Sequence, residues 1–128
     1  MSDTPNNVNT EARSFRQDDP LALIGLPTLK SIQYVRVSDI LYCKGESSQT
    51  SVFLANHSRV MITRTLHQCE FILANFGFCR IHKSYVINLG HVKEYTKSET
   101  HTISLSDGTR LEVSKSYKDL LKARLNCI

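Results

Sequence analysis

Three basic side chains fall within four positions of one short segment of the chain. Arg80, His82 and Lys83 lie there, and the hydroxyl of Ser84 follows directly. Cationic and hydroxyl donors side by side are the groups that contact DNA phosphates and the acceptors on base edges. The surrounding residues 78–88 read FCRIHKSYVIN, so apolar residues flank the cluster and can pin it to a core. This pattern favours a nucleic-acid contact.

Two further polar segments have a similar character. Ser114, Lys115 and Ser116 form a second basic, hydroxyl-rich cluster directly after an expected hairpin strand, and residues 45–50 read GESSQT. Each segment could instead be an ordinary solvated loop, and for residues 45–50 taken alone that is the stronger interpretation.

Motifs typical of enzymes are missing from the sequence. It contains no GxGxxG, GxxxxGK[ST], HExxH or GxSxG pattern. Cys79 and His82 have the spacing C-x2-H, which could supply two metal ligands or a nucleophile with its base. A structural metal site needs a second pair, and a nucleophile needs a third, orienting group. We therefore predict no enzyme, metal site, cofactor or small-molecule substrate, and favour a core cysteine beside a structural histidine.

The length of the chain predicts a single domain, and its charge is unevenly distributed. The 128 residues carry a formal net charge of +4, which splits into −2 over residues 1–20 and +6 over residues 21–128. A basic folded part favours a polyanionic partner. We expect residues 1–20 to be a flexible tail or linker, in which Asp18 and Asp19 are a solvated pair and not the paired acids of a receiver domain.

The expected location follows from what the sequence lacks. The first twenty residues are polar, with no apolar core of a signal peptide, and no stretch approaches the ~18 apolar residues that a membrane span needs. We predict a cytoplasmic protein with no membrane partner. Four cysteines without a CxxC spacing are then expected to be buried free thiols.

A hydrophobic period of two dominates most of the chain. It predicts strands at residues 21–26, 31–37, 40–44, 50–54, 60–62, 78–81, 92–97, 102–106 and 109–113. Asp107-Gly108 predicts a tight hairpin turn. Residues 84–89 fit either a strand or one helical turn. No alternation of strands and helices is visible, so a mostly β, antiparallel fold is expected.

Two helices interrupt this pattern. Thr65 and Gln68 fit a capping box at the start of the first, and Gly77 suits its left-handed end. Its apolar residues recur at i, i+3, i+7 and i+10 and are Leu66, Cys69, Leu73 and Phe76. A short C-terminal helix is expected behind a cap at Ser116 and Asp119, with an apolar stripe of Tyr117, Leu120, Leu121 and Leu125.

These motifs, in this order, resemble the LytTR DNA-binding domain, the output domain of LytR/AgrA/AlgR-type bacterial response regulators. The resemblance rests on FxRIHKSYVINL, the helix before it, the DG hairpin and V-S-K-x-Y-K-x-L. The opening DILYCKGESSQTSVFL is similar to that family's I-x-Y-x-E-A-x-x-x-Y-x-x-(V/I) segment. The resemblance to the family covers about residues 28–125 of the chain. It implies an elongated, mostly antiparallel β fold. The family commonly carries an N-terminal receiver domain, for which 128 residues leave no room, so we expect either a stand-alone regulator or an excised output domain.

The resemblance also implies how DNA is read. Loops in successive major grooves contact bases, usually at paired direct repeats bound by two protomers. The implied base-reading positions are Gln49 or Thr50, Lys83 and Lys115. The implied phosphate or positioning contacts are Ser84, Ser114 and Ser116, while Arg80 and His82 either touch DNA or anchor their loop.

Two other functions stay open at this point. A β-rich interaction module could use the same basic surface to bind an acidic protein. A Cys/His redox-sensing protein could use Cys43 or Cys79, which would require an exposed thiol with a lowered pKa.

Overall fold

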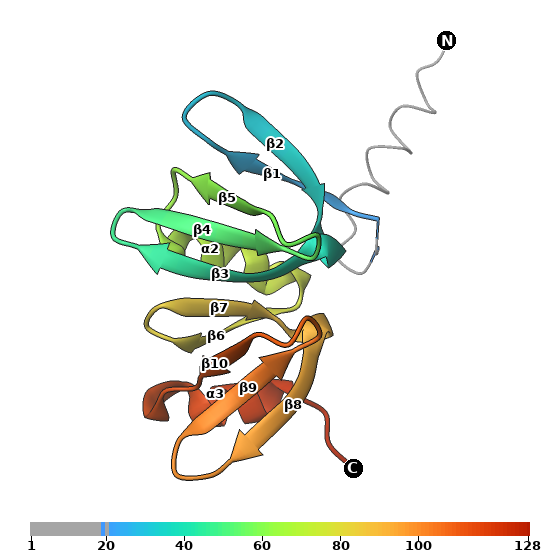
Figure 1. Ribbon diagram of the computed structural model, residues 1–128, viewed down its shortest axis with the longest axis vertical. Coiled ribbons are helices and arrows are strands. Elements are labelled where there is room, and N and C mark those ends of the chain that lie inside the picture. Colours follow the sequence, from blue (N-terminus) through green and yellow to red (C-terminus); the bar gives the residue numbers. More distant parts are fainter. Residues whose placement is uncertain (1–18, 20) are drawn as a thin grey trace.

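The computed structural model describes residue 19 and residues 21–128. The tail or linker predicted for residues 1–20 therefore lies, apart from Asp19, outside the described residues. Figure 1 shows three antiparallel sheets that follow one another along the long axis of the described part. The prediction of an elongated, mostly β fold with two short helices is confirmed.

The central sheet has five strands in the order β5-β4-β3-β7-β6. Its strands are β3 (Ile40–Glu46), β4 (Gln49–Leu54), β5 (Arg59–Ile62), β6 (Phe78–His82) and β7 (Tyr85–Asn88). The segment that could have been a strand or a helical turn is thus strand β7. Its register pairs Cys79 of β6 with Ile87 and Cys43 of β3 with Val86.

Smaller sheets flank the central one at its two ends. β1 (Leu23–Pro27) pairs with β2 (Ile32–Arg36), and β8 (Val92–Lys97), β9 (His101–Leu105) and β10 (Arg110–Glu112) form the other. The predicted Asp107-Gly108 turn joins β9 to β10, and Gly108 has a φ of 94°. That backbone conformation costs an L side chain steric strain, so glycine suits the turn.

Helix α2 (Leu66–Leu73) starts at the predicted capping box. Thr65 Oγ1 accepts a hydrogen bond from Gln68 N–H at 3.2 Å, and Thr65 N–H donates to Gln68 Oε1 at 2.9 Å. A 3₁₀ turn, η2 (Ala74–Phe76), and then Gly77 with a φ of 84° end the helix. The predicted apolar face is confirmed, because Leu66, Cys69 and Leu73 are buried.

The start of the C-terminal helix differs from the prediction. Residues Lys115–Tyr117 form a 3₁₀ turn, η4, and α3 (Lys118–Arg124) follows it. Ser116 lies inside that turn, and the residue at the N-cap position of α3 is Tyr117, which makes no side-chain cap hydrogen bond, so the predicted cap at Ser116 is wrong. The stripe is also narrower than predicted, because Leu121 is buried while Leu120 is 49% exposed.

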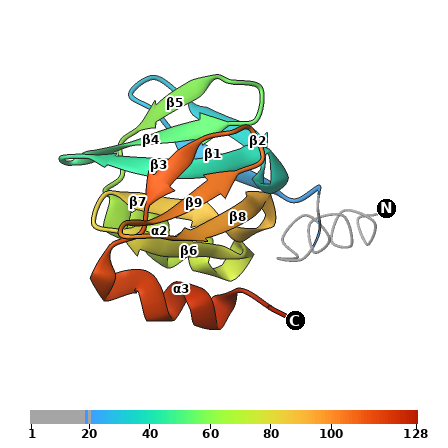
Figure 2. The same cartoon turned by 60° about the horizontal axis from the view of Figure 1, so that its bottom comes forward.

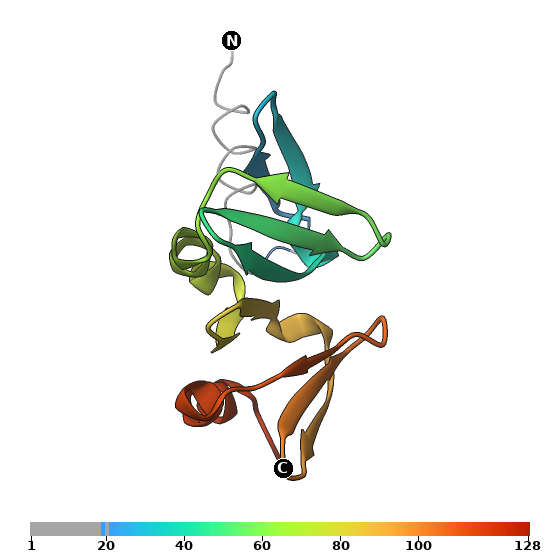
Figure 3. The same cartoon turned by 60° about the vertical axis from the view of Figure 1, so that its left-hand side comes forward.

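The central sheet is covered on both faces. Neighbouring residues of β7 point to opposite sides, so Val86 packs in the core under α2 and Ile87 packs in the core under α3 and the three-stranded sheet. Figure 3 shows α2 and α3 one above the other along one side of the molecule. No helix in the described part of the chain has the length and apolar character to cross a membrane.

Asn88 at the end of β7 joins these layers. Its Nδ2 donates to the carbonyl oxygens of Ile40 at 2.9 Å and Val37 at 3.4 Å, and its Oδ1 accepts from Gly90 N–H at 2.9 Å. The side chain is buried. A buried amide with three partners fixes the end of the sheet relative to the chain before β3.

Candidate nucleic-acid interface

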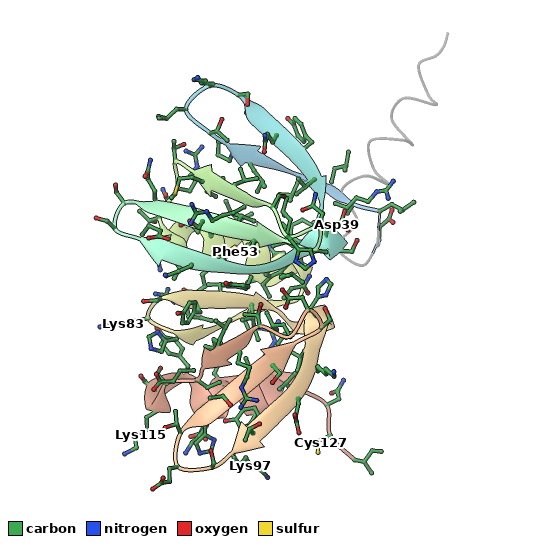
Figure 4. The ribbon with its side chains drawn as sticks, viewed as in Figure 1. Asp39, Phe53, Lys83, Lys97, Lys115 and Cys127 are labelled. Atoms are coloured by element: carbon green, nitrogen blue, oxygen red, sulfur yellow. The ribbon has the colours of Figure 1, made fainter. Side chains whose placement is uncertain are left out.

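The three predicted segments lie along one edge of the molecule. This edge, here called the loop edge, carries the β3–β4 turn, the β6–β7 turn and η4. They stay on the same side when the molecule is turned (Figure 2). Figure 4 shows Lys83 and Lys115 projecting outward from it. The fold therefore brings together what the sequence only places far apart.

Two backbone hydrogen bonds tie the three segments to each other. Gly45 N–H donates to Ser84 O at 2.9 Å, and Ser114 N–H donates to Ile81 O at 2.9 Å. Both acceptors belong to the β6–β7 hairpin, which thus sits between the other two segments.

A Cβ on Gly45 would lie 3.2 Å from Leu66 Cβ, so glycine permits the close approach of β3 to α2.

Arg80 anchors the β6–β7 turn from beneath. Its Nε donates to His82 O at 2.8 Å, its Nη2 to Lys83 O at 2.6 Å and its Nη1 to Glu70 Oε1 at 2.8 Å. The side chain is only 13% exposed. A planar guanidinium with fixed donors suits this threefold contact, which a lysine could not reproduce.

The same guanidinium reaches the third segment. Arg80 Cζ lies 5.8 Å from the centre of the Tyr117 ring in η4, within the range of a cation–π contact. Glu70 comes from α2, so Arg80 links a helix, a hairpin and a 3₁₀ turn. Of the two roles open for Arg80, the structure supports the anchoring one.

His82 shapes the top of the same turn. Its Nδ1 accepts a hydrogen bond from Ser84 N–H at 3.1 Å, and its ring lies 5.3 Å from that of Tyr85. An acceptor at Nδ1 places the ring proton of neutral histidine on Nε2. His82 therefore also anchors its loop, in the tautomer that this contact assigns.

The predicted contact residues differ in how accessible they are. Lys83, Lys115 and Ser116 are exposed, and Gln49 and Ser84 are half-buried. These five positions have accessible side chains at the loop edge. Their roles in DNA contact stay predictions.

Two predicted contact residues do not fit that role. Thr50 is fully buried, and its Oγ1 donates to Arg64 O at 2.8 Å, so Gln49 is the accessible one of the first pair. Ser114 Oγ is buried without a hydrogen-bond partner within the described residues. Alternation along a strand hides Thr50, and the sequence could not show that β4 starts at Gln49.

The thiols do not provide a redox centre at this edge. Cys43, Cys69 and Cys79 are buried and free, and burial raises the pKa of each of these thiols. The prediction of four buried thiols is wrong for Cys127, which is free but exposed near the C-terminus. A reactive thiol needs exposure and a lowered pKa, which Cys43 and Cys79 lack. Within the described residues, no three His, Cys, Asp or Glu side chains gather to hold a metal ion.

Sequence reasoning missed Glu70 and Tyr117 as partners of Arg80. The sequence pattern places Tyr117 in the apolar stripe of the C-terminal helix, and Glu70 belongs to none of the motifs although it lies on α2. Their roles depend on packing between elements far apart in the chain, for which the sequence offers no local signal.

Comparison with known proteins gives consistent matches. The family model described as the LytTr DNA-binding domain matches residues 30–126. The "Sensory transduction protein LytT" of Bacillus subtilis is 32% identical over 122 residues, covering 93% of this chain and 48% of that protein. The "Transcriptional regulatory protein LytR" of Staphylococcus aureus is 26% identical over 123 residues, covering 94% of this chain and 48% of that protein.

A solved structure shows the same fold. A LytTr DNA-binding domain from Bacillus cereus superposes with a TM-score of 0.69 at 24% identity, covering 82% of this chain and 97% of that one. The chain spans about half the length of the curated relatives it matches.

Proposed function

The chain belongs to the LytTr DNA-binding domain family, and from this premise we propose that it is the DNA-binding part of a bacterial transcription regulator in the cytoplasm. The loop edge contacts duplex DNA, and no cofactor takes part. The observation that carries this proposal is the Arg80 anchor, whose three hydrogen bonds hold Lys83 outward at the centre of that edge.

Lys83 and Lys115 are the proposed base readers. A lysine in the major groove donates to O6 and N7 of guanine, and its charge also attracts phosphate. Gln49 at the β3–β4 turn can bond N6 and N7 of adenine in the same way that glutamine does elsewhere. Ser84 and Ser116 are next to the two lysines in the sequence, and their hydroxyls contact the phosphate backbone of the DNA.

A fixed protein backbone at the loop edge makes the contacts with DNA more favourable. Flexible loops lose conformational freedom when they bind, and that loss is subtracted from the affinity. Here the turn after β6 is already held by Arg80 and His82, and the two neighbouring segments are hydrogen-bonded to it. The loop edge is thus organised before DNA arrives.

Binding at paired direct repeats by two protomers is part of the proposal. Each protomer then covers one repeat, with its three segments in successive major grooves. If a protomer makes about four to six phosphate contacts, the logarithm of the binding constant should fall with the logarithm of salt concentration with a slope of about −4 to −5.

Selection of bound duplexes from a random pool tests the proposal. We expect enrichment of one motif, repeated twice at fixed spacing. Lys83→Ala and Lys115→Ala should weaken binding to the selected duplex, and loss of a base contact should relax discrimination at one position by about 1–3 kcal/mol. Arg59→Ala is a matched control, because this exposed cation starts β5 and pairs with Phe53, near the end of β4 that lies away from the β3–β4 turn.

Two outcomes would contradict the proposal. Absence of any enriched motif together with a flat salt dependence would remove DNA as the partner. Retention of the protein on acidic polypeptides, undisturbed by competing duplex DNA, would favour the interaction module instead.

A further inference from the structure

A hollow of about 270 Å³ lies directly beside the third segment of the loop edge. His101, Lys115 and Lys118 line it, together with the carboxylates of Glu99 and Glu112. Val113 N–H donates to His101 O at 2.9 Å, which fixes the start of β9 next to the strand that leads into η4. His101 is therefore a close neighbour of the proposed base reader Lys115.

The imidazole of His101 is held from one side. Tyr95 Oη and His101 Nδ1 are 2.9 Å apart, and the two rings meet edge to face at 5.6 Å. Lys122 Nζ in turn lies 5.8 Å from the centre of the Tyr95 ring. With Nδ1 engaged by Tyr95, Nε2 is the ring atom available to a ligand in the hollow.

The charges that act on His101 are mainly positive. Loss of hydration lowers its pKa first, and the lysines Lys118, Lys122 and Lys97 lower it further. The acidic groups near His101 and Tyr95 are Glu99 and Glu112 in the wall of the hollow and Asp119, whose charge adds to burial in raising the pKa of Tyr95. The surroundings therefore lower the pKa of His101, because lost hydration and the lysines both disfavour the imidazolium.

We propose that this hollow seats a DNA backbone phosphate next to the base read by Lys115, and that His101 binds a proton as the phosphate enters. The proposal rests on the proposed function, since it presupposes duplex DNA at the loop edge. Lys118, which lines the hollow, then acts as a point charge for the phosphate, and Nε2 of His101 becomes a charged donor to a phosphate oxygen.

The direction of the pH effect follows from the charges. In the free protein the lysines disfavour the imidazolium, whereas a phosphate in the hollow favours it. DNA affinity therefore rises as pH falls through the pKa of His101 in the complex. It stops rising below the lower pKa of the free protein, where both states are already protonated.

Fluorescence anisotropy with the selected duplex tests this, at constant ionic strength and between about pH 5.5 and 8. His101→Gln keeps a side chain that can form hydrogen bonds but cannot gain a proton. As the pH is lowered over this range, we expect the dissociation constant of the unmodified protein to fall by about threefold to tenfold more than that of His101→Gln. The uptake of one proton changes affinity by at most about tenfold per pH unit. His57→Gln, in the β4–β5 turn, should behave like the unmodified protein.

A proton NMR titration of His101 supplies a second readout. Its pKa should be higher in the complex than in the free protein, and Lys118→Gln should reduce the salt slope by about 1. Equal pH profiles for the unmodified protein and His101→Gln, with no change in that pKa on binding, would overturn the inference while DNA binding itself stands. Failure of the unmodified protein to bind any duplex would instead overturn the proposed function.

Discussion

Arg80 donates a hydrogen bond of 2.6 Å from Nη2 to the carbonyl oxygen of Lys83. One cation thus fixes the backbone of another, and their side chains point in different directions, with Arg80 toward the core and Lys83 toward solvent. The arrangement separates the tasks of two basic residues only three positions apart in the sequence, since Arg80 builds the turn and Lys83 is presented by it.

Replacing this anchor should reduce both stability and DNA binding. Arg80→Met keeps the apolar stem but removes hydrogen bonds to two carbonyl oxygens and to Glu70. Because bonds to a charged donor contribute more than neutral ones, we expect a loss of about 2–3 kcal/mol in the free energy of unfolding, measured by urea denaturation. DNA affinity should fall by more than about tenfold under conditions where the variant is still folded.

Glu70→Gln is the matched control for the anchor. It keeps an oxygen that accepts from Arg80 and leaves both bonds to the turn in place, so DNA affinity should change little. An Arg80→Met protein that is folded and binds DNA with unchanged affinity would show that the turn does not need the anchor.

The acceptor on His82 can be tested in the same turn. His82→Phe preserves a flat ring beside Tyr85 but leaves Ser84 N–H without its partner. An unpaired half-buried donor costs about 1 kcal/mol or more, and the position of Lys83 should become less defined. His82→Asn, whose Oδ1 can take the place of Nδ1, should retain more DNA affinity than His82→Phe in anisotropy titrations. The reverse order would argue that the ring itself meets DNA.

Asn88 should be a strong determinant of stability. Asn88→Ala removes a buried amide and leaves the carbonyl oxygens of Ile40 and Val37 without the donor that they share. We expect a loss of about 2–3 kcal/mol, seen as a lower urea midpoint with an unchanged slope. Thr65→Ala provides a scale, since loss of this helix cap should cost about 1 kcal/mol. A smaller effect at Asn88 than at Thr65 would contradict its linking role.

Local signals predicted most of the fold. The capping box at Thr65, the turn at Asp107-Gly108 and the period of two each depend on residues a few positions apart, and each is confirmed. The predicted cap at Ser116 is wrong because residues Lys115–Tyr117 form the 3₁₀ turn η4, in which Tyr117 N–H donates to Ser114 O at 3.0 Å. Ser116 is therefore part of this turn and does not cap α3. That turn depends on contacts with β6, which no local pattern reveals.

The candidate site was predicted less completely than the fold. Residue types identified the three segments, but burial decides which members face outward. The residue pattern places Thr50 among the DNA contacts although its side chain is buried, and it leaves two roles open for Arg80, which the structure pairs with Glu70. Both outcomes depend on which face of a strand is covered, and this in turn depends on α2 packing there.

Ser114 and Ser116 form a pair of hydroxyls that can be distinguished experimentally. Ser114 Oγ is buried without a hydrogen-bond partner in the described part of the chain, whereas Ser116 is exposed two positions later. A buried, unpaired hydroxyl costs free energy, so Ser114→Ala should leave stability unchanged or raise it by about 1 kcal/mol. Its backbone N–H still donates to Ile81 O, so the position of Lys115 is kept.

DNA affinity separates the two positions further. We expect Ser114→Ala to bind the selected duplex within about twofold of the unmodified protein, because a hydroxyl without exposed surface meets no phosphate. Ser116→Ala should weaken binding by about threefold to tenfold without loss of stability, the range expected for one neutral hydrogen bond. Should Ser114→Ala prove the more damaging of the two, its hydroxyl would have to turn outward when DNA binds. The loop edge would then rearrange on binding and would not be fixed in advance.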